Sequence, residues 1–370
     1  MKMERLRKLI YNILSFLNLL IPKKKRIVVY GGANLNDNNE AMFSYLLNET
    51  RYTVICIADK HRDYKLRTNV RFVKNSYFNA IVFILSSTVI IDCSYHTIKA
   101  IPTKKQMFLQ MWHGSPLKYM NPSSGLINHG DLFSLFLYSA EIFKHHMKDF
   151  FGVTEKKMFL NGNPRCDYLF KERPDESHFT IIWLPTYRKS KGRVQTHNDI
   201  PLLDCNNAIT LDYFLEEQDV DLYIKPHPMQ SVPFEKTIGS RRFKRIHIIN
   251  DEYLYNKQLS LYEFLAKTDA LITDYSSVYY DYLLANRPIC FAIDDFDEYG
   301  KNTGYAFNDP LKYMPGAIAK TYDDLCEFIE DSRNGIDNYK SDRERVNNIV
   351  NYYKDNKNCE RCVEILKKYL

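Results

Sequence analysis

Two histidines lie where an imidazole could act as a general acid or base. His113 comes at the end of an apolar run, residues 107–112, and is followed by Gly114, which lets a ligand approach the backbone. His227 is held between two prolines, with Lys225 two residues before it. An imidazole has a near-neutral pKa and a lysine supplies positive charge, so both segments suit proton transfer or anion binding. A purely structural role for either histidine is the alternative that the local pattern leaves open.

Basic and hydroxyl-bearing residues near other turns could bind phosphate. Lys118 lies near the first histidine, Arg165 follows a turn, and Arg188 follows a strand that ends in proline. An arginine can hold a phosphate with two hydrogen bonds, or it can pair with a surface carboxylate. A further segment is predicted to end a strand and open a helix, where hydroxyls and amides attract an anion or act as plain N-caps. Its polar members are Thr273, Asp274, Ser276 and Ser277.

The composition favours a globular protein that binds an anion. Of the 370 residues, 45% are hydrophobic and 26% charged, which excludes disordered chains, collagen-like fibres and coiled-coil rods. Basic residues exceed acidic ones by 51 − 45 = 6, which suits an anionic substrate or a membrane surface but not a typical nucleic-acid-binding protein. The usual glycine-rich dinucleotide and P-loop motifs do not occur. The 8 cysteines are scattered and favour reduced thiols, as in a cytosolic protein.

Alternating strands and helices must position these residues. A chain of this length fits two domains of about 150 residues. Over residues 26–172, short apolar runs alternate with helix-length segments, which predicts a Rossmann-like domain with a parallel sheet. The pattern restarts over residues 173–340 and predicts a second α/β domain, and the polar tail, residues 341–370, is expected to form one closing helix. Tandem domains of this kind bind ligands at the carboxyl ends of their strands, in a crevice between the domains.

The apolar runs also predict individual elements. In the first domain, strands are predicted at residues 26–30, 52–58, 88–92, 107–112 and 158–160, and helices at 39–47 and 79–85. In the second domain, strands are predicted at residues 180–184, 221–224, 245–249, 270–273 and 288–292.

The N-terminal segment, residues 1–25, is predicted to form a helix that lies on a membrane. Its apolar stretch, residues 9–21, is shorter than the roughly 20 residues that span a bilayer, and no cleavage site of a secretory signal follows it. Asn12, Ser15 and Asn18 recur at every third position and would form a narrow polar face. Basic residues at both ends of the stretch suit anionic lipid. The alternative is a helix that packs on its own domain.

Five motifs occur in a fixed order between residues 112 and 281: W-H-G-S-P-L-K, G-N-P-R-C-D, L-P-T-Y-R, K-P-H-P and T-D-Y-S-S-V-Y-Y-D. Together they resemble the CDP-glycerol glycerophosphotransferase family, which comprises teichoic-acid primases and polymerases and their capsule-assembly relatives. The resemblance extends over nearly the whole chain. It implies a GT-B-like α/β fold, in which an N-terminal Rossmann-like acceptor domain and a C-terminal Rossmann-like nucleotide-donor domain enclose an interdomain cleft.

The resemblance also implies a reaction at the cytoplasmic face of the cell membrane. A polyol phosphate, glycerol phosphate being the first expectation, passes from a CDP-activated donor to a hydroxyl of a cell-wall or capsule polymer or a lipid-linked acceptor, and CMP leaves. His113 is the implied base for the acceptor hydroxyl, and His227 is the second implied catalytic residue. The residues implied to bind substrate are Gly114, Lys118, Arg165, Arg188, Lys225, Thr273, Asp274, Ser276 and Ser277. Neither a metal nor a cofactor other than the donor substrate is expected.

Several alternatives stay open. Thr303 stands where family members commonly carry an arginine before a glycine, so glycerol phosphate, ribitol phosphate and a sugar-linked variant all fit. The same fold could serve a glycosyltransferase that uses a nucleotide sugar, or a non-catalytic membrane-bound assembly factor. Two D-x-D pairs, Asp219 with Asp221 and Asp295 with Asp297, could bind Mg²⁺, but solvated acidic loops are the preferred interpretation.

Overall fold

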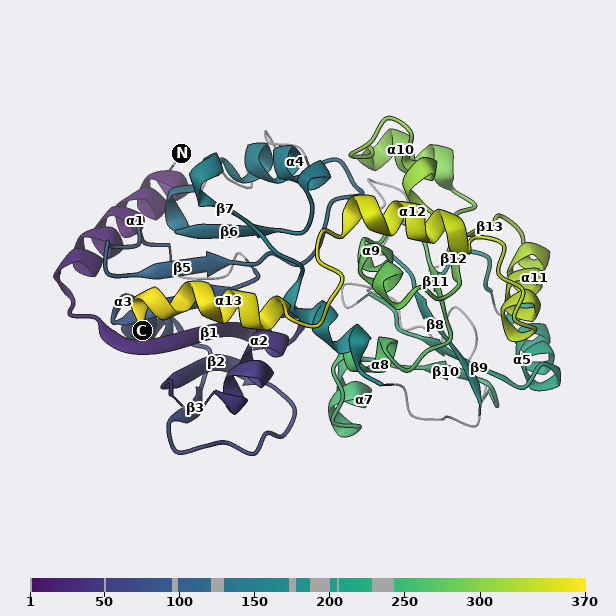
Figure 1. Cartoon of the computed structure of the whole chain (residues 1–370), viewed down its shortest axis with the longest axis horizontal. Helices are drawn as coiled ribbons and strands as arrows, with labels where there is room; N and C mark the ends of the chain where they lie inside the picture. The colour runs from purple at the N-terminus through teal and green to yellow at the C-terminus, as the bar shows by residue number, and fades with distance from the viewer. Residues whose placement is uncertain are drawn as a thin grey trace. The chain divides into compact units, whose positions relative to one another are not determined.

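The chain folds into two units, each built on its own parallel sheet (Figure 1). The first unit contains Met1–Ser115, Met120–Tyr168 and Val350–Leu370, and the second contains Pro116–Tyr119 and Leu169–Ile349. Each unit alternates strands with helices and is Rossmann-like, as the sequence predicts. A computed structural model describes residues 2–49, 51–94, 99–120, 130–172, 178–186, 200–204, 206–227 and 243–370.

The first unit has a seven-stranded sheet in the order β3-β2-β1-β4-β5-β6-β7, and every neighbouring pair is parallel. Its central strands β1, β2 and β4 contain runs of buried aliphatic residues, as expected for a sheet that is covered on both faces. The strands are β1 (Lys24–Asn34), β2 (Val54–Lys60), β3 (Val70–Val73), β4 (Ser87–Asp92), β5 (Met107–Gln110), β6 (Leu135–Tyr138) and β7 (Met158–Leu160).

The helices of the first unit start and stop at residues with suitable side chains or backbone angles. The Ser76 hydroxyl accepts a hydrogen bond from the Asn79 amide at the start of α3, and α4 ends at Gly152, whose φ of 62° favours glycine. Among the residues that the structure describes, no helix has both the length and the hydropathy needed to cross a membrane. The helices are α1 (Lys2–Leu20), α2 (Asp37–Asn48), α3 (Tyr77–Leu85), α4 (Glu141–Phe151) and α13 (Asn358–Leu366), with 3₁₀ turns at Gly130–Leu132, Glu155–Lys157, Pro164–Phe170 and Lys367–Tyr369.

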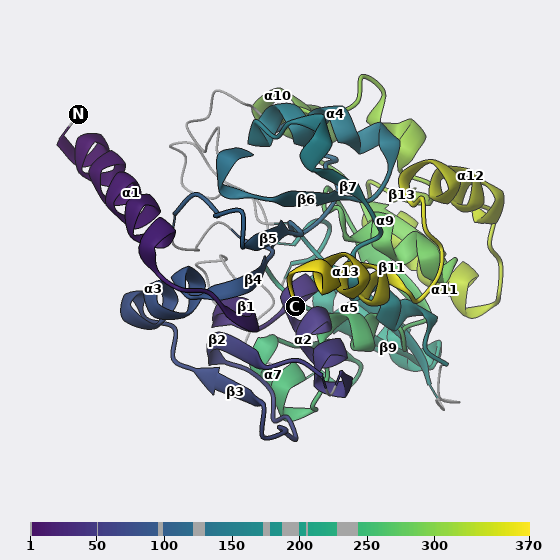
Figure 2. The same ribbon diagram turned by 60° about the vertical axis from the view of Figure 1, so that its left-hand side comes forward.

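Figure 2 shows that α1 extends outward and meets the rest of the first unit near its last turns. Polar side chains near the end of the helix make this attachment. The Asn18 amide donates to the carbonyl oxygen of Ile101 at 2.8 Å and to the side chain of Gln106 at 2.7 Å. The Ser15 hydroxyl accepts from the Ile101 amide at 3.1 Å. Asn12 is exposed, so only two of the three predicted polar residues contact protein. The helix therefore docks through polar residues and leaves most of its apolar residues exposed.

The second unit has a six-stranded parallel sheet in the order β10-β9-β8-β11-β12-β13. Trp183, Leu222 and Ile272 are fully buried in its core, together with side chains from α5 and α11. The strands are β8 (Phe179–Leu184), β9 (Val220–Ile224), β10 (Ile246–Ile248), β11 (Ala270–Thr273), β12 (Ile289–Ala292) and β13 (Ala317–Ala319). The helices are α5 (Asn207–Glu217), α7 (Asp251–Asn256), α8 (Leu261–Leu265), α9 (Val278–Tyr282), α10 (Phe296–Thr303), α11 (Tyr322–Arg333) and α12 (Lys340–Val350), with 3₁₀ turns at Leu283–Ala285 and Pro310–Tyr313.

The C-terminal tail corrects one prediction. Two helices, α12 and α13, form the tail instead of the single closing helix that the sequence predicts. The side chain of Asp167 accepts hydrogen bonds from backbone amides at the start of α13. The Asp167 carboxylate accepts from the amides of Asn358 at 2.9 Å and Cys359 at 2.8 Å. The start of α13 is thereby fixed to the loop after β7 in the first unit.

We predict that Asp167→Ala lowers the free energy of unfolding by about 1–3 kcal/mol, because two amides of α13 lose their acceptor inside the protein. Denaturant unfolding followed by circular dichroism measures the change. Asp342→Ala is the matched control, since this exposed carboxylate makes only a surface ion pair with Arg345. Equal stability of the Asp167→Ala variant and the wild type would contradict this account of the tail.

Candidate active site

The loop after β5 presents His113 at the carboxyl edge of the first sheet. The ring is exposed, and its Nδ1 lies 3.3 Å from the carbonyl oxygen of Cys93, which follows the neighbouring strand β4. Because a carbonyl oxygen only accepts, this hydrogen bond keeps the proton on Nδ1 and leaves Nε2 as the basic nitrogen. The loop backbone is unusual, since Trp112 has a φ of 55° and Gly114 a φ of 142°. A tryptophan in the left-handed region is strained, so other interactions must hold this loop.

Two side chains, one from the first turn of α2 and one from the 3₁₀ turn Pro164–Phe170, hold the backbone around His113. The Asn38 amide donates to the carbonyl oxygen of Trp112 at 2.8 Å. Arg165 Nη1 donates to the carbonyl oxygen of His113 at 3.0 Å and forms an ion pair with Asp37. Arg165 is only 4% exposed, and its guanidinium holds the backbone of the His113 loop. The phosphate contact expected for it from the sequence stays a prediction.

In the second unit, Asp274 ties together the loops that follow β8 and β11. Its buried carboxylate accepts from the Thr186 amide at 2.9 and 3.0 Å, from the Thr186 hydroxyl, and from the Tyr275 amide at 2.6 Å. Thr273 is also buried, and its hydroxyl donates to the carbonyl oxygen of Leu184 at 2.9 Å. Both side chains form hydrogen bonds within the unit, and the substrate contacts expected for Thr273 and Asp274 stay predictions. These hydrogen bonds fix the loops after β8 and β11 at the carboxyl edge of the sheet, where other polar groups are exposed.

Two lysines help to lower the pKa of His227, which follows β9. Lys225 is buried, and its Nζ lies 2.9 Å from the Asp251 carboxylate. Desolvation by the surrounding protein, followed by the positive charges of Lys118 and Lys225, lowers the pKa of the exposed His227 ring. The ring is therefore neutral at neutral pH and takes up a proton at a lower pH than an ordinary histidine. A neutral imidazole beside ammonium groups is suited to a site that binds an anion.

Ser276 and Ser277 are half-buried hydroxyl residues at the start of α9. The Ser276 hydroxyl accepts a long hydrogen bond, 3.4 Å, from the Val278 amide, and the Ser277 side chain caps no helix amide. Because β9, β8 and β11 are neighbours, the two serines and His227 follow strands of one carboxyl edge. Cations, hydroxyls and a neutral imidazole together form a set that suits phosphate.

Aromatic residues position Lys118 within the second unit. Lys118 pairs with Tyr305 in an isolated antiparallel bridge, and its Nζ lies 5.7 Å from the centre of the Tyr299 ring. Tyr299 stacks on Tyr275 at 3.7 Å. The predicted site residues include neither these tyrosines nor Asn38. Of these residues, the sequence gives a signal only for Asn38, which begins a polar pair directly after the first strand.

The remaining predictions concern Arg188 and the acidic pairs. Arg188 lies outside the residues that the structure describes. Asp219 and Asp221 both pair with Arg245, at 2.8 and 3.5 Å, and Asp295 accepts from a tyrosine hydroxyl. Across the described ranges, no group of three or more histidine, cysteine, aspartate or glutamate side chains could hold a metal ion.

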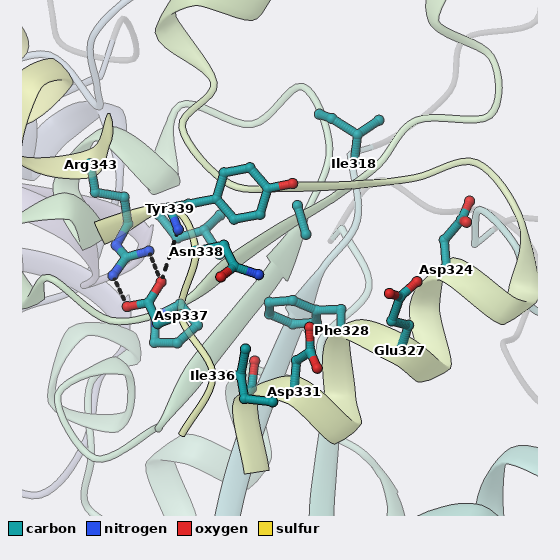
Figure 3. A pocket seen from close by; sticks show the side chains of 14 residues that line it. Ile318, Asp324, Glu327, Phe328, Asp331, Ile336, Asp337, Asn338, Tyr339 and Arg343 are labelled. Carbon is teal, nitrogen blue, oxygen red and sulfur yellow. Dashed lines mark hydrogen bonds and ion pairs between the residues drawn. The ribbon is translucent and has the colours of Figure 1, made fainter. Parts of the chain in front are cut away.

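A pocket of about 160 Å³ in the second unit lies away from these residues (Figure 3). It is lined by residues at the starts of β12 and β13, and therefore lies near the amino ends of these strands. Acidic side chains of α11 face it, and Asp337 pairs there with Arg343. An acidic lining disfavours phosphate, so the carboxyl edge with His227 is the better candidate site.

We predict that Lys118→Met raises the pKa of His227 toward the ordinary histidine value, because the variant removes a positive charge that lowers it. NMR titration of the imidazole resonances measures the shift. Lys320→Met, which removes an exposed lysine elsewhere in the same unit, is the control and should leave the titration unchanged. An identical His227 titration in Lys118→Met and the wild type would show that Lys118 does not act on this ring.

Comparison with known proteins identifies the family. The sequence pattern of the family described as "CDP-Glycerol:Poly(glycerophosphate) glycerophosphotransferase" matches residues 13–368. A teichoic acid ribitol-phosphate primase of Bacillus spizizenii is 24% identical, over 97% of this chain and 95% of the relative. A teichoic acid poly(glycerol phosphate) polymerase of the same organism is also 24% identical, over 95% of this chain and 93% of the relative.

Solved structures show the same fold. The wall teichoic acid polymerase TagF, in a variant soaked with CDPG, superposes with a TM-score of 0.76 at 18% identity and covers 94% of this chain and 89% of that chain. MnaA of S. aureus, solved with UDP, superposes with a TM-score of 0.57 at 13% identity and covers 94% of this chain and 97% of that chain. The predicted GT-B-like α/β fold is confirmed.

The family pattern spans nearly the whole chain, over a fold of two Rossmann-like units. Members of the family transfer a polyol phosphate from a CDP-activated donor, and the predicted activity is confirmed at this level. The chain therefore belongs to the CDP-glycerol:poly(glycerophosphate) glycerophosphotransferase family of phosphotransferases.

Proposed function

We propose that this enzyme transfers glycerol phosphate from CDP-glycerol to a hydroxyl of a lipid-linked or polymeric cell-wall or capsule acceptor. The acceptor oxygen forms a bond to the phosphorus that carries the glycerol. The bond from that phosphorus to the oxygen of CMP breaks, and CMP leaves with the bonding electrons. The observation that carries the proposal is a set of groups at one carboxyl edge of the second sheet, where the exposed His227 ring and the half-buried hydroxyls of Ser276 and Ser277 follow neighbouring parts of the sheet.

His113 is the proposed base for the acceptor hydroxyl. In its exposed ring, protonated Nδ1 donates a hydrogen bond to the carbonyl oxygen of Cys93, so Nε2 carries the lone pair that can take up the proton lost by the hydroxyl. The contacts of Arg165 and Asn38 with the loop backbone support this role, because a base must be held in place to act on a bound hydroxyl. Arg165 and Asn38 are thus the proposed positioning residues of this loop.

The second unit supplies the proposed donor site. The phosphates of the donor would contact His227, Lys118, Ser276 and Ser277, which together offer positive charge and hydrogen-bond donors. The negative charge that develops on the departing CMP is stabilised by these groups, and no step of this proposal requires a metal. Lys225 contributes less, since Asp251 already neutralises part of its charge.

We predict that His113→Ala and His227→Ala each lower turnover at least about a hundredfold, the low end for loss of a general base or of a charge-stabilising group. The measurement is CMP release from CDP-glycerol in the presence of a hydroxyl acceptor. His145→Ala is the matched control, because this imidazole of α4 is exposed and pairs only with Asp149.

Thermal unfolding of the three variants checks that each remains folded. Near-wild-type turnover by folded His113→Ala or His227→Ala would refute the role of that histidine. Release of UDP from a sugar nucleotide, with no CMP from a CDP-polyol, would identify the enzyme as a glycosyltransferase instead.

We also propose that α1 attaches the enzyme peripherally to the cytoplasmic face of the membrane. Ser15 and Asn18 use the polar side of the helix to contact protein, and most of the apolar side chains of α1 other than the buried Leu14 are exposed. The exposed apolar residues of α1 are Leu6, Leu9, Ile10, Ile13, Phe16, Leu17, Leu19 and Leu20. Basic residues flank the apolar stretch, residues 9–21, and each adds about 1 kcal/mol of attraction near anionic lipid.

We predict that Phe16→Ser with Leu20→Ser, made in the full chain, lowers flotation with vesicles that contain phosphatidylglycerol, because two exposed apolar groups of α1 become polar. A chain that starts at Ile27 should float still less. High salt should weaken the flotation of the wild type, since it screens charges beyond about 8 Å. Flotation of both variants equal to that of the wild type would contradict the attachment.

A further inference from the structure

α3 exposes two large aromatic residues at its start. Eight of its nine residues are apolar, a composition typical of a helix that is covered on all sides. Its Ala80, Phe83, Ile84 and Leu85 are buried, but Tyr77 is 83% exposed and Phe78 is 75% exposed. Val82, one turn after Phe78, is exposed as well. Neighbouring exposed apolar residues of this size mark a surface that binds another partner.

Hydrogen bonds join α3 to the end of α1. Gln106 accepts from Asn18 of α1 at 2.7 Å and donates to the carbonyl oxygen of Ile84 in α3 at 3.0 Å. Lys23 donates both to Asn18 and to the carbonyl oxygen of Leu85, the last residue of α3. Figures 1 and 2 both show α3 beside the last turns of α1. The end of α3 therefore lies beside the end of α1, and Phe78, seven residues before Leu85, lies about 10 Å farther along α3.

Two arginines lie at the same region. The guanidinium groups of Arg26 and Arg71 lie 5.0 and 5.3 Å from the centre of the Phe83 ring in α3. Arg26 donates to two serine hydroxyls, and within the described part of the chain neither arginine forms an ion pair with a carboxylate. Desolvation and the charge of Arg71 lower the pKa of Arg26. An anion between or beside these groups would stabilise both charges.

We infer that α1 and α3 together form a membrane-binding surface, here called the α1–α3 surface, on which Tyr77 and Phe78 enter the headgroup layer of an anionic bilayer. The α1–α3 surface comprises the exposed apolar residues of α1, Tyr77, Phe78 and Val82 of α3, and the cations Lys24, Lys25, Arg26 and Arg71. The inference rests on the proposed attachment through α1 and adds a second point of contact. Because Arg26 and Arg71 form no ion pair with a carboxylate of the described residues, lipid phosphates would supply the negative charge beside them.

The charge of this surface selects lipid over a second copy of the chain. Symmetric self-association would bring cations against cations, whereas anionic headgroups complement them. Tyrosine and phenylalanine also suit the bilayer interface, where an apolar ring can be buried while polar neighbours stay in water. Two separate contacts would fix how the first unit lies on the bilayer, because a single helix leaves rotation about its axis free.

The test uses the full chain with Tyr77→Ser and Phe78→Ser, and vesicles of equal parts phosphatidylglycerol and phosphatidylcholine. We expect the partition coefficient to fall at least tenfold while CMP release with a water-soluble acceptor stays unchanged. Tyr213→Ser with Leu311→Ser is the matched control, since these residues are exposed in the second unit. Unchanged partition of the α3 variant would overturn the inference, and a loss of self-association measured by light scattering without lipid would assign the surface to a second copy.

A Phe78→Trp variant provides a readout that does not depend on the fold of the serine variant. Its added fluorescence, relative to the wild type with its 2 tryptophans, should shift to the blue on these vesicles and be quenched by brominated lipid. No shift and no quenching would overturn the insertion of α3. If the α1 variants lose flotation while the α3 variants behave as wild type, the attachment through α1 stands and this inference fails.

Discussion

All strand pairs of both sheets are parallel, and this constraint determines where the rest of the structure can place reactive groups. Loops that follow parallel strands converge on one edge, so residues far apart in the sequence become neighbours there. Asn38 and Arg165 meet at the His113 loop in this way, and Thr186 meets Asp274. Without such contacts the buried polar groups of these irregular loops would have no partners, which costs about 1–3 kcal/mol for each group.

Burial separates the positioning residues from the residues proposed to react. Arg165 and Asp274 occur in motifs that carry the family resemblance, yet both are buried and satisfied by protein partners. His113 and His227, from the same set of motifs, are exposed. The strained backbone of Trp112 is tolerated because the loop is held from two sides, and this fixes the ring that follows it.

Local sequence patterns suffice to predict most of the sheets and the helices α2 and α3, because a buried parallel strand is a short apolar run. They fail for the short strands β3, β6 and β13, of which β3 and β13 lie at the edges of their sheets. They also do not show that Arg165 pairs with Asp37, which lies 128 residues earlier in the sequence. The apolar composition of α3 is visible in the sequence, but only the fold shows that Tyr77 and Phe78 are uncovered.

The central claim is that the enzyme lengthens a hydroxyl acceptor by a polyol phosphate taken from a CDP-activated donor. Mass spectrometry of a lipid-linked acceptor tests it most directly, after separate incubations with CDP-glycerol and with CDP-ribitol. The account predicts that the acceptor gains the mass of glycerol phosphate with CDP-glycerol, with one CMP formed for each unit added. An acceptor that gains no mass with either donor, or gains a sugar from a nucleotide sugar, would contradict it.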